Sequence, residues 1–151
     1  MGKELDKAEE VKELAEQVIE EEGIFLSTVR PNIDYIFVTP HISKTVIARC
    51  IRTNNELKYY SKSDYIIEVS EDIWHILPED IKKIVLLHEL LHIYIVYDEN
   101  SGNYTFKLID HDVKDFRKII DKYGTDWFKT IKKEMADKLE LKAEDIDNIT
   151  L

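Results

Sequence analysis

The sequence predicts an α+β fold with one helix at the start, a small and mostly antiparallel sheet of three or four strands, a buried helix, and a further helix. Three observations lead to this prediction. Apolar residues recur at helical spacing over residues 4–22, short β-branched and aromatic runs fill much of residues 34–69, and an apolar run of helical length covers residues 81–97. The chain has 151 residues, of which 44% are hydrophobic, and this suits a single compact domain over residues 1–151.

The first half of the chain supplies the N-terminal helix and the sheet. We expect residues 4–22 to form an amphipathic helix that ends at Gly23. Runs rich in β-branched and aromatic residues follow, and an Asn-Asn pair separates two of them as a turn. The expected strands are residues 34–39, 46–53, 57–60 and 65–69.

The second half is mainly helical. Pro78 suits the start of a helix, and the sequence from Ile81 to Tyr97 is apolar nearly all round, which predicts a buried central helix. A loop, a short strand and two amphipathic helices follow, and the polar tail is expected to fray. Their expected ranges are 98–103 for the loop, 104–109 for the strand, 112–123 and 125–141 for the helices, and 142–151 for the tail.

Composition disfavours several classes of protein. The formal net charge of −10 makes nucleic acid an unlikely partner, because a strongly acidic chain repels the phosphate backbone. Cys50 is the only cysteine, so neither an intrachain disulfide nor a cysteine-built zinc site is expected. No signal-peptide pattern is visible, and no apolar run reaches the ~18 residues of a membrane span. We therefore expect a soluble, cytoplasmic protein with no membrane partner.

The apolar run contains an H-E-x-x-H pattern, formed by His88, Glu89 and His92. On a helix, residues four apart lie on the same face, so both imidazoles can bind one metal ion while the glutamate reaches a water beside it. A composition like this one produces the pattern by chance only about 0.02 times per chain. The alternative is that both histidines are core residues with hydrogen-bond partners and that Glu89 pairs with a lysine.

A catalytic zinc site needs a third protein ligand and keeps one position for water. The long metzincin pattern requires glycine at position 95 and histidine at position 98, where this chain has Ile95 and Asp98, so that class is rejected. We favour His111, because zinc prefers imidazole and the intervening loop and strand can bring it back to the first helix. The other candidates are Glu99, Asp110 and Asp112.

The run HELLHI, followed by a loop and HDVKDFRKIIDKYGTDW, resembles the putative phage metallopeptidase family and, more broadly, the SprT-like minimal zincins. The resemblance covers about residues 57–128. It implies a minimal zincin-like fold in which His88, His92 and His111 bind one Zn²⁺ ion and Glu89 is the catalytic base. Asp112 and Asp115 are near enough in sequence to orient a metal-binding histidine.

The leading hypothesis is therefore a zinc-dependent metallopeptidase that hydrolyses peptide bonds through a metal-activated water, with Glu89 as general base. Its partner is then a peptide or protein substrate, which an exposed strand edge at residues 65–69 would bind as an added strand. Two alternatives stay open, namely a non-enzymatic metal-binding or interaction protein and a dedicated regulatory protease with one protein substrate. A protease associated with nucleic acid is a further alternative, because residues 107–133 hold more basic than acidic side chains.

Overall fold

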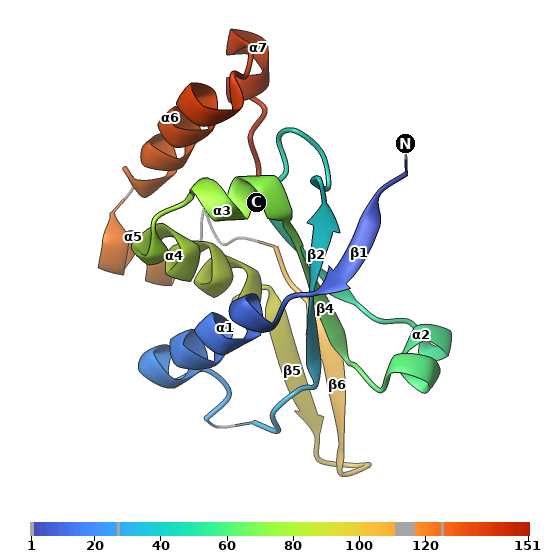
Figure 1. Cartoon of the computed structure of the whole chain (residues 1–151). Coiled ribbons are helices and arrows are strands. Elements are labelled where there is room, and N and C mark those ends of the chain that lie inside the picture. Colours follow the sequence, from blue (N-terminus) through green and yellow to red (C-terminus); the bar gives the residue numbers. More distant parts are fainter. Residues whose placement is uncertain (1, 27, 111–116, 125) are drawn as a thin grey trace.

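The computed structural model describes residues 2–26, 28–110, 117–124 and 126–151. Within these ranges the chain is an α+β protein in which helices α1 and α4 lie on one side of a central sheet and a separate β-hairpin extends from the body (Figure 1). The strands are β1 (Glu4–Lys7), β2 (Ile33–Thr39), β3 (Ala48–Arg52), β4 (Tyr65–Ser70), β5 (Ile93–Asp98) and β6 (Asn103–Leu108). The helices are α1 (Glu9–Glu22), α2 (Asn55–Ser61), α3 (Glu71–Ile76), α4 (Glu79–Leu90), α5 (Arg117–Tyr123), α6 (Trp127–Leu139) and α7 (Ala143–Ile146).

The central sheet is mixed and has the strand order β1-β2-β4-β3. The inner pair, β2 and β4, is parallel, whereas β1 pairs antiparallel with β2 and β3 pairs antiparallel with β4. The parallel pair arises because the chain between β2 and β4 first forms β3, at the outer edge, and then α2. The prediction of 65–69 as an exposed edge is therefore wrong, because β4 lies between β2 and β3, and the outer strands of this sheet are β1 and β3.

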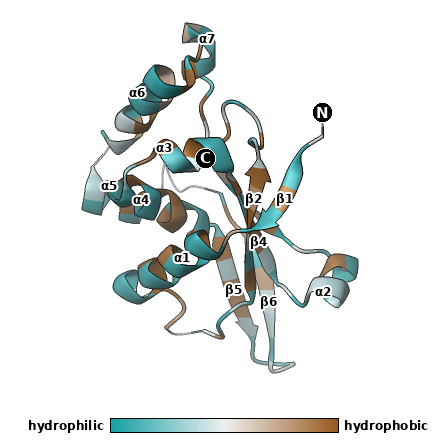
Figure 2. Cartoon of the chain, in the orientation of Figure 1, coloured by the Kyte–Doolittle hydropathy of each residue, from teal (hydrophilic) through white to brown (hydrophobic). Residues whose placement is uncertain are grey.

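The N-terminal helix is shorter than its amphipathic pattern predicts. Residues Glu4–Lys7 form an edge strand on β2, and α1 begins only at Glu9. The amide of Ala8 donates to the carbonyl of Tyr35 at 2.9 Å, which continues the pairing up to the first residue of the helix. Pairing with a neighbouring strand thus satisfies backbone groups that a longer helix would have left at its open N-terminus. Figure 2 shows teal and brown alternating along α1, as expected for an amphipathic helix.

Residues 57–60 are helical, so the prediction of a returning strand there is wrong. The side chain of Asn54 accepts a hydrogen bond from the amide of Leu57 at 2.8 Å, which is the geometry of a helix N-cap. Helix α2 then ends at Ser61, and its C-cap residue Lys62 adopts a left-handed conformation with φ of 63°. The Asn-Asn pair therefore starts a helix instead of closing a hairpin, because the side chain of Asn54 caps the first turn.

The long apolar run divides into a helix and a strand. Helix α4 ends at Leu90, and β5 follows almost at once and pairs antiparallel with β6, with Ile93 opposite Leu108. Residues 93–97 are mostly β-branched or aromatic, so they favour a strand once a partner strand is present. The prediction of one helix over 81–97 is therefore correct for its first part and wrong for its last part.

One cluster of buried hydrophobic residues joins α1, the inner sheet face, α3, α4, α5 and α6. Trp74 and Trp127 belong to it. The last ten residues, whose polarity predicts fraying, include helix α7 and Ile149, which is 3% exposed. Among the described residues, no helix is long and apolar enough to cross a membrane.

Candidate metal centre

The candidate site lies at the C-terminal end of α4, where the helix passes into β5. The amide of Leu91 donates to the carbonyl of Leu87 at 3.0 Å, and the amide of His92 donates to the carbonyl of Glu89 at 3.2 Å. The last bond spans three residues, so His92 lies in a tightened final turn just beyond the α-helix. This turn keeps the two histidines on one side of the helix although the helix itself ends at Leu90.

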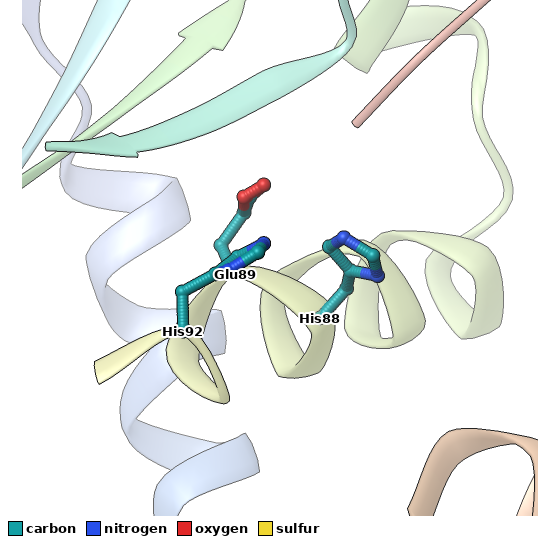
Figure 3. Close-up of side chains that lie close together, drawn as sticks. All are labelled: His88, Glu89 and His92. Carbon is teal, nitrogen blue, oxygen red and sulfur yellow. The ribbon is translucent and has the colours of Figure 1, made fainter. Parts of the chain in front are cut away.

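Figure 3 shows His88, Glu89 and His92 extending from this end of α4. Each residue contributes one potential ligand atom, and these atoms lie within 4.8 Å of one another. The two imidazole rings are 5.1 Å apart between centroids and are inclined at 73°. His88 and Glu89 are buried and His92 is partly exposed, so the group lies at the boundary between the core and solvent. The spacing predicted from the sequence is thus present in three dimensions.

The backbone of Ile109 holds His92 in place. The Nδ1 atom of His92 lies 2.6 Å from the carbonyl oxygen of Ile109, and the Ile109 amide donates to the His92 carbonyl at 2.9 Å. A carbonyl oxygen only accepts, so this bond requires a proton on Nδ1 and, in the neutral imidazole, leaves Nε2 as the ligand atom. A carbonyl behind the ring in this way is the usual support of a metal-binding histidine.

Glu89 is the most unusual group in the site. Its side chain is 1% exposed, and its Oε2 atom has no hydrogen-bond partner in the part of the chain that the structure describes. Burial raises the pKa of this carboxyl from its ordinary value of 4.5 to about 8. A buried oxygen without a partner is costly, and a cation held by the neighbouring imidazoles would stabilise the ionised form. The donor set therefore fits a metal ion.

A pocket of about 280 Å³ lies beside Glu89 and His92. Its other walls come from β3, from the end of β6 with the residues that follow, and from the last residue of the sequence. The predicted ligand candidate Asp110 lines it, together with Arg49 and Cys50, which the sequence did not single out as site residues. Besides Glu89 and His92, the residues that line the pocket are Arg49, Cys50, Leu108, Ile109, Asp110 and Leu151.

The remaining sequence candidates fall into two groups. His111, Asp112 and Asp115 lie outside the described residues, so their roles stay predictions. Glu99 lies in the loop at the far end of the β5–β6 hairpin, whose strand β5 begins next to His92. The six residues of β5 span about 20 Å, and this length of strand separates Glu99 from the site.

A tyrosine hydroxyl can stabilise a developing oxyanion, and four tyrosines follow the H-E-x-x-H pattern in the sequence. Tyr94, Tyr97 and Tyr104 lie on the hairpin and are among the exposed large side chains, while Tyr123 packs against the hydrophobic core. None of these four tyrosines is among the described residues that line the pocket. His41 and His75 lie outside the cluster, since the ring of His41 contacts the carboxylate of Asp72 and the ring of His75 lies near two glutamates.

Two imidazoles on one helical turn, with a buried glutamate between them, define a metal-binding centre of the kind that metallopeptidases use. Comparison with known proteins agrees, because the model of the family described as putative phage metallopeptidase matches residues 3–139. The match covers most of the sequence, and the chain belongs to this family. Neither the curated proteins nor the solved structures gave a match. The relationship to SprT-like zincins stays a prediction.

Proposed function

We propose that the protein is a zinc-dependent peptidase in which His88 and His92 hold the ion and Glu89 acts as the general base. The observation that carries this proposal is the buried carboxyl of Glu89, whose Oε2 atom lacks a partner among the described residues, between two imidazoles within 4.8 Å. We propose His111 as the third ligand on the strength of its residue type and its place in the sequence. Zn²⁺, when bound, supplies Lewis acidity that polarises the scissile carbonyl.

Glu89 is suited to moving a proton at neutral pH. Burial raises its pKa to about 8 in the metal-free chain, and a bound cation would lower that pKa again, so the ionised carboxylate that accepts a proton would be available at neutral pH. In the proposed reaction an oxygen of Glu89 accepts a proton from the attacking water, and the same carboxyl then donates it to the leaving nitrogen. The buried surroundings of Glu89 also keep bulk water away from the carboxyl.

The hydrogen bond from His92 to Ile109 has a role in this proposal. It holds Nδ1 against the Ile109 carbonyl, which leaves Nε2 for the ion, and it ties the site to the end of β6. A peptide would enter through the pocket, which borders Glu89 on one side and the edge strand β3 on the other. Main-chain pairing with an edge strand is a common way for a protein to bind an extended peptide without strict sequence preference.

The proposal is tested by metal analysis together with peptidase assays of three proteins. The purified wild type is expected to hold one zinc ion per chain, and Glu89→Gln to keep that ion while losing activity by about 10²- to 10⁴-fold. His75→Ala removes a histidine that lies outside the cluster and is the matched control, with unchanged metal content and activity.

Two results would overturn the proposal, namely a wild type without stoichiometric zinc or an active Glu89→Gln protein. Casein is included as a substrate alongside a peptide library. Broad cleavage of casein separates a general peptidase from a regulatory protease with a single substrate.

A further inference from the structure

The last residues of the sequence extend the central sheet at its outer edge. The amide of Thr150 donates to the carbonyl of Thr45 at 2.7 Å, and the amide of Ile47 donates to the carbonyl of Thr150 at 2.9 Å. These bonds form a parallel bridge between Val46 and Thr150. Ile149, which is 3% exposed, anchors this segment in the core.

This segment leads into the pocket beside the candidate metal centre. Thr150 lies beside Val46, and the edge strand β3 begins two residues further on, at Ala48. Leu151 comes next and forms part of the pocket wall together with Glu89 and His92. In Figure 3 the red end of the chain approaches the helix on the side to which Glu89 points.

The arrangement has a simple geometric consequence. An added peptide strand that pairs with β3 can run along residues 48–52, but the edge position before Ala48 is already occupied by Thr150. Five strand residues correspond to about 17 Å, and the pocket itself is about 280 Å³. The space available to a peptide is therefore short and is bounded at one end by the protein's own chain.

We infer that residues 149–151 close one end of the peptide-binding cleft, so that the site takes short peptides. This inference rests on the proposed peptidase function, and it names the substrate class by length. Leu151 is the residue that limits the length, because its side chain is partly exposed and faces the pocket. Ile149 and Thr150 hold Leu151 there through burial and backbone hydrogen bonds.

The test separates the length limit from catalysis. Zinc-loaded Glu89→Gln protein is immobilised and exposed to a pooled library of peptides of four to sixteen residues, and mass spectrometry gives the lengths that are retained. The same measurement is made after adding Leu151→Gly, which removes the side chain but leaves the backbone bonds of Thr150 in place. Leu141→Gly is the matched control, because Leu141 is also a partly buried leucine near the end of the sequence and lies outside the pocket lining.

We expect the parent protein to retain mainly short peptides, and we expect Leu151→Gly to increase the retention of peptides longer than eight residues about tenfold. Leu141→Gly should leave the length distribution unchanged. The inference is overturned if the parent protein retains long and short peptides equally, if the two leucine variants behave alike, or if no peptide is retained.

Cleavage of the same library by protein with an intact Glu89 then distinguishes the two claims. Cuts near one end of each peptide, moving inward with Leu151→Gly, support both the peptidase function and the length limit. Length-selective retention without any cleavage contradicts the proposed function and leaves the length limit standing.

Discussion

The buried carboxyl of Glu89 should make the metal-free protein less stable as the pH rises from about 4.5 to about 8. In the unfolded chain this group ionises near 4.5, whereas in the folded protein burial holds its pKa at about 8. Between these values the folded state binds a proton that the unfolded state has lost. The free energy of unfolding therefore falls with rising pH across this window, and it is unaffected by Glu89 below it.

The magnitude follows from the width of the window. Each pH unit within it changes the free energy of unfolding by about 1.4 kcal/mol, so the whole interval corresponds to a loss on the order of 5 kcal/mol. A domain of this size is stable by only about 5–15 kcal/mol, so the loss is a large part of the total. A bound cation reverses the effect, because it favours the ionised carboxylate.

Urea unfolding of chelator-treated protein between pH 4.5 and 8.5 measures this loss. Glu89→Gln keeps the shape of the neutral carboxyl but cannot ionise, so its stability should exceed that of the wild type increasingly as the pH rises. His88 and His92 are present in both proteins, so the difference between the two isolates Glu89. Glu99→Gln alters an exposed carboxyl in the hairpin loop and is the matched control. A difference between wild type and Glu89→Gln that stays constant from pH 5 to pH 8 would refute the reasoning.

Three further predictions concern the fold. Ile149→Ala should lower the free energy of unfolding, measured in urea, by about 2–5 kcal/mol, because it leaves a cavity in the core. Leu26→Ala changes an exposed leucine and is the control, and an equal loss in the two variants would contradict the expectation. Burial raises the pKa of the Cys50 thiol, so iodoacetamide at pH 8 should alkylate Cys50 far more slowly in the native protein than in the urea-unfolded protein. Equal alkylation rates in the two states would contradict this expectation. Asn54→Ala should cost about 1 kcal/mol through loss of the α2 cap, whereas Asn55→Ala, one residue into the helix, should cost less in the same urea assay.

The sequence was sufficient to predict the fold class and the grouping of His88, Glu89 and His92, because both depend on short-range periodicity. A spacing of four residues places two side chains on one helical side whatever the rest of the fold does. That grouping persists even though α4 ends at Leu90, since the final tight turn carries His92 round to the same side.

The missed elements depend on contacts between residues far apart in the sequence. Strand β1 forms because β2 offers it an open edge, and β5 forms because β6 pairs with it, and neither partner can be identified from local patterns. The short segment at residues 57–60 has a weak local preference, which the cap from Asn54 decides. The pocket wall formed by Arg49 and Leu151 was beyond sequence reasoning for the same reason, because about 100 residues separate them.

The paired bonds between His92 and Ile109 also bear on the order in which the site assembles. Helix α4 is a local structure and can form early, but the ring of His92 is oriented only after β6 has returned along β5. Local opening of the hairpin would release the ring while leaving the helix intact. Hydrogen exchange at the Ile109 amide should therefore report the same opening event that would control dissociation of a metal ion bound as proposed, so the two rates should change together when the hairpin is weakened.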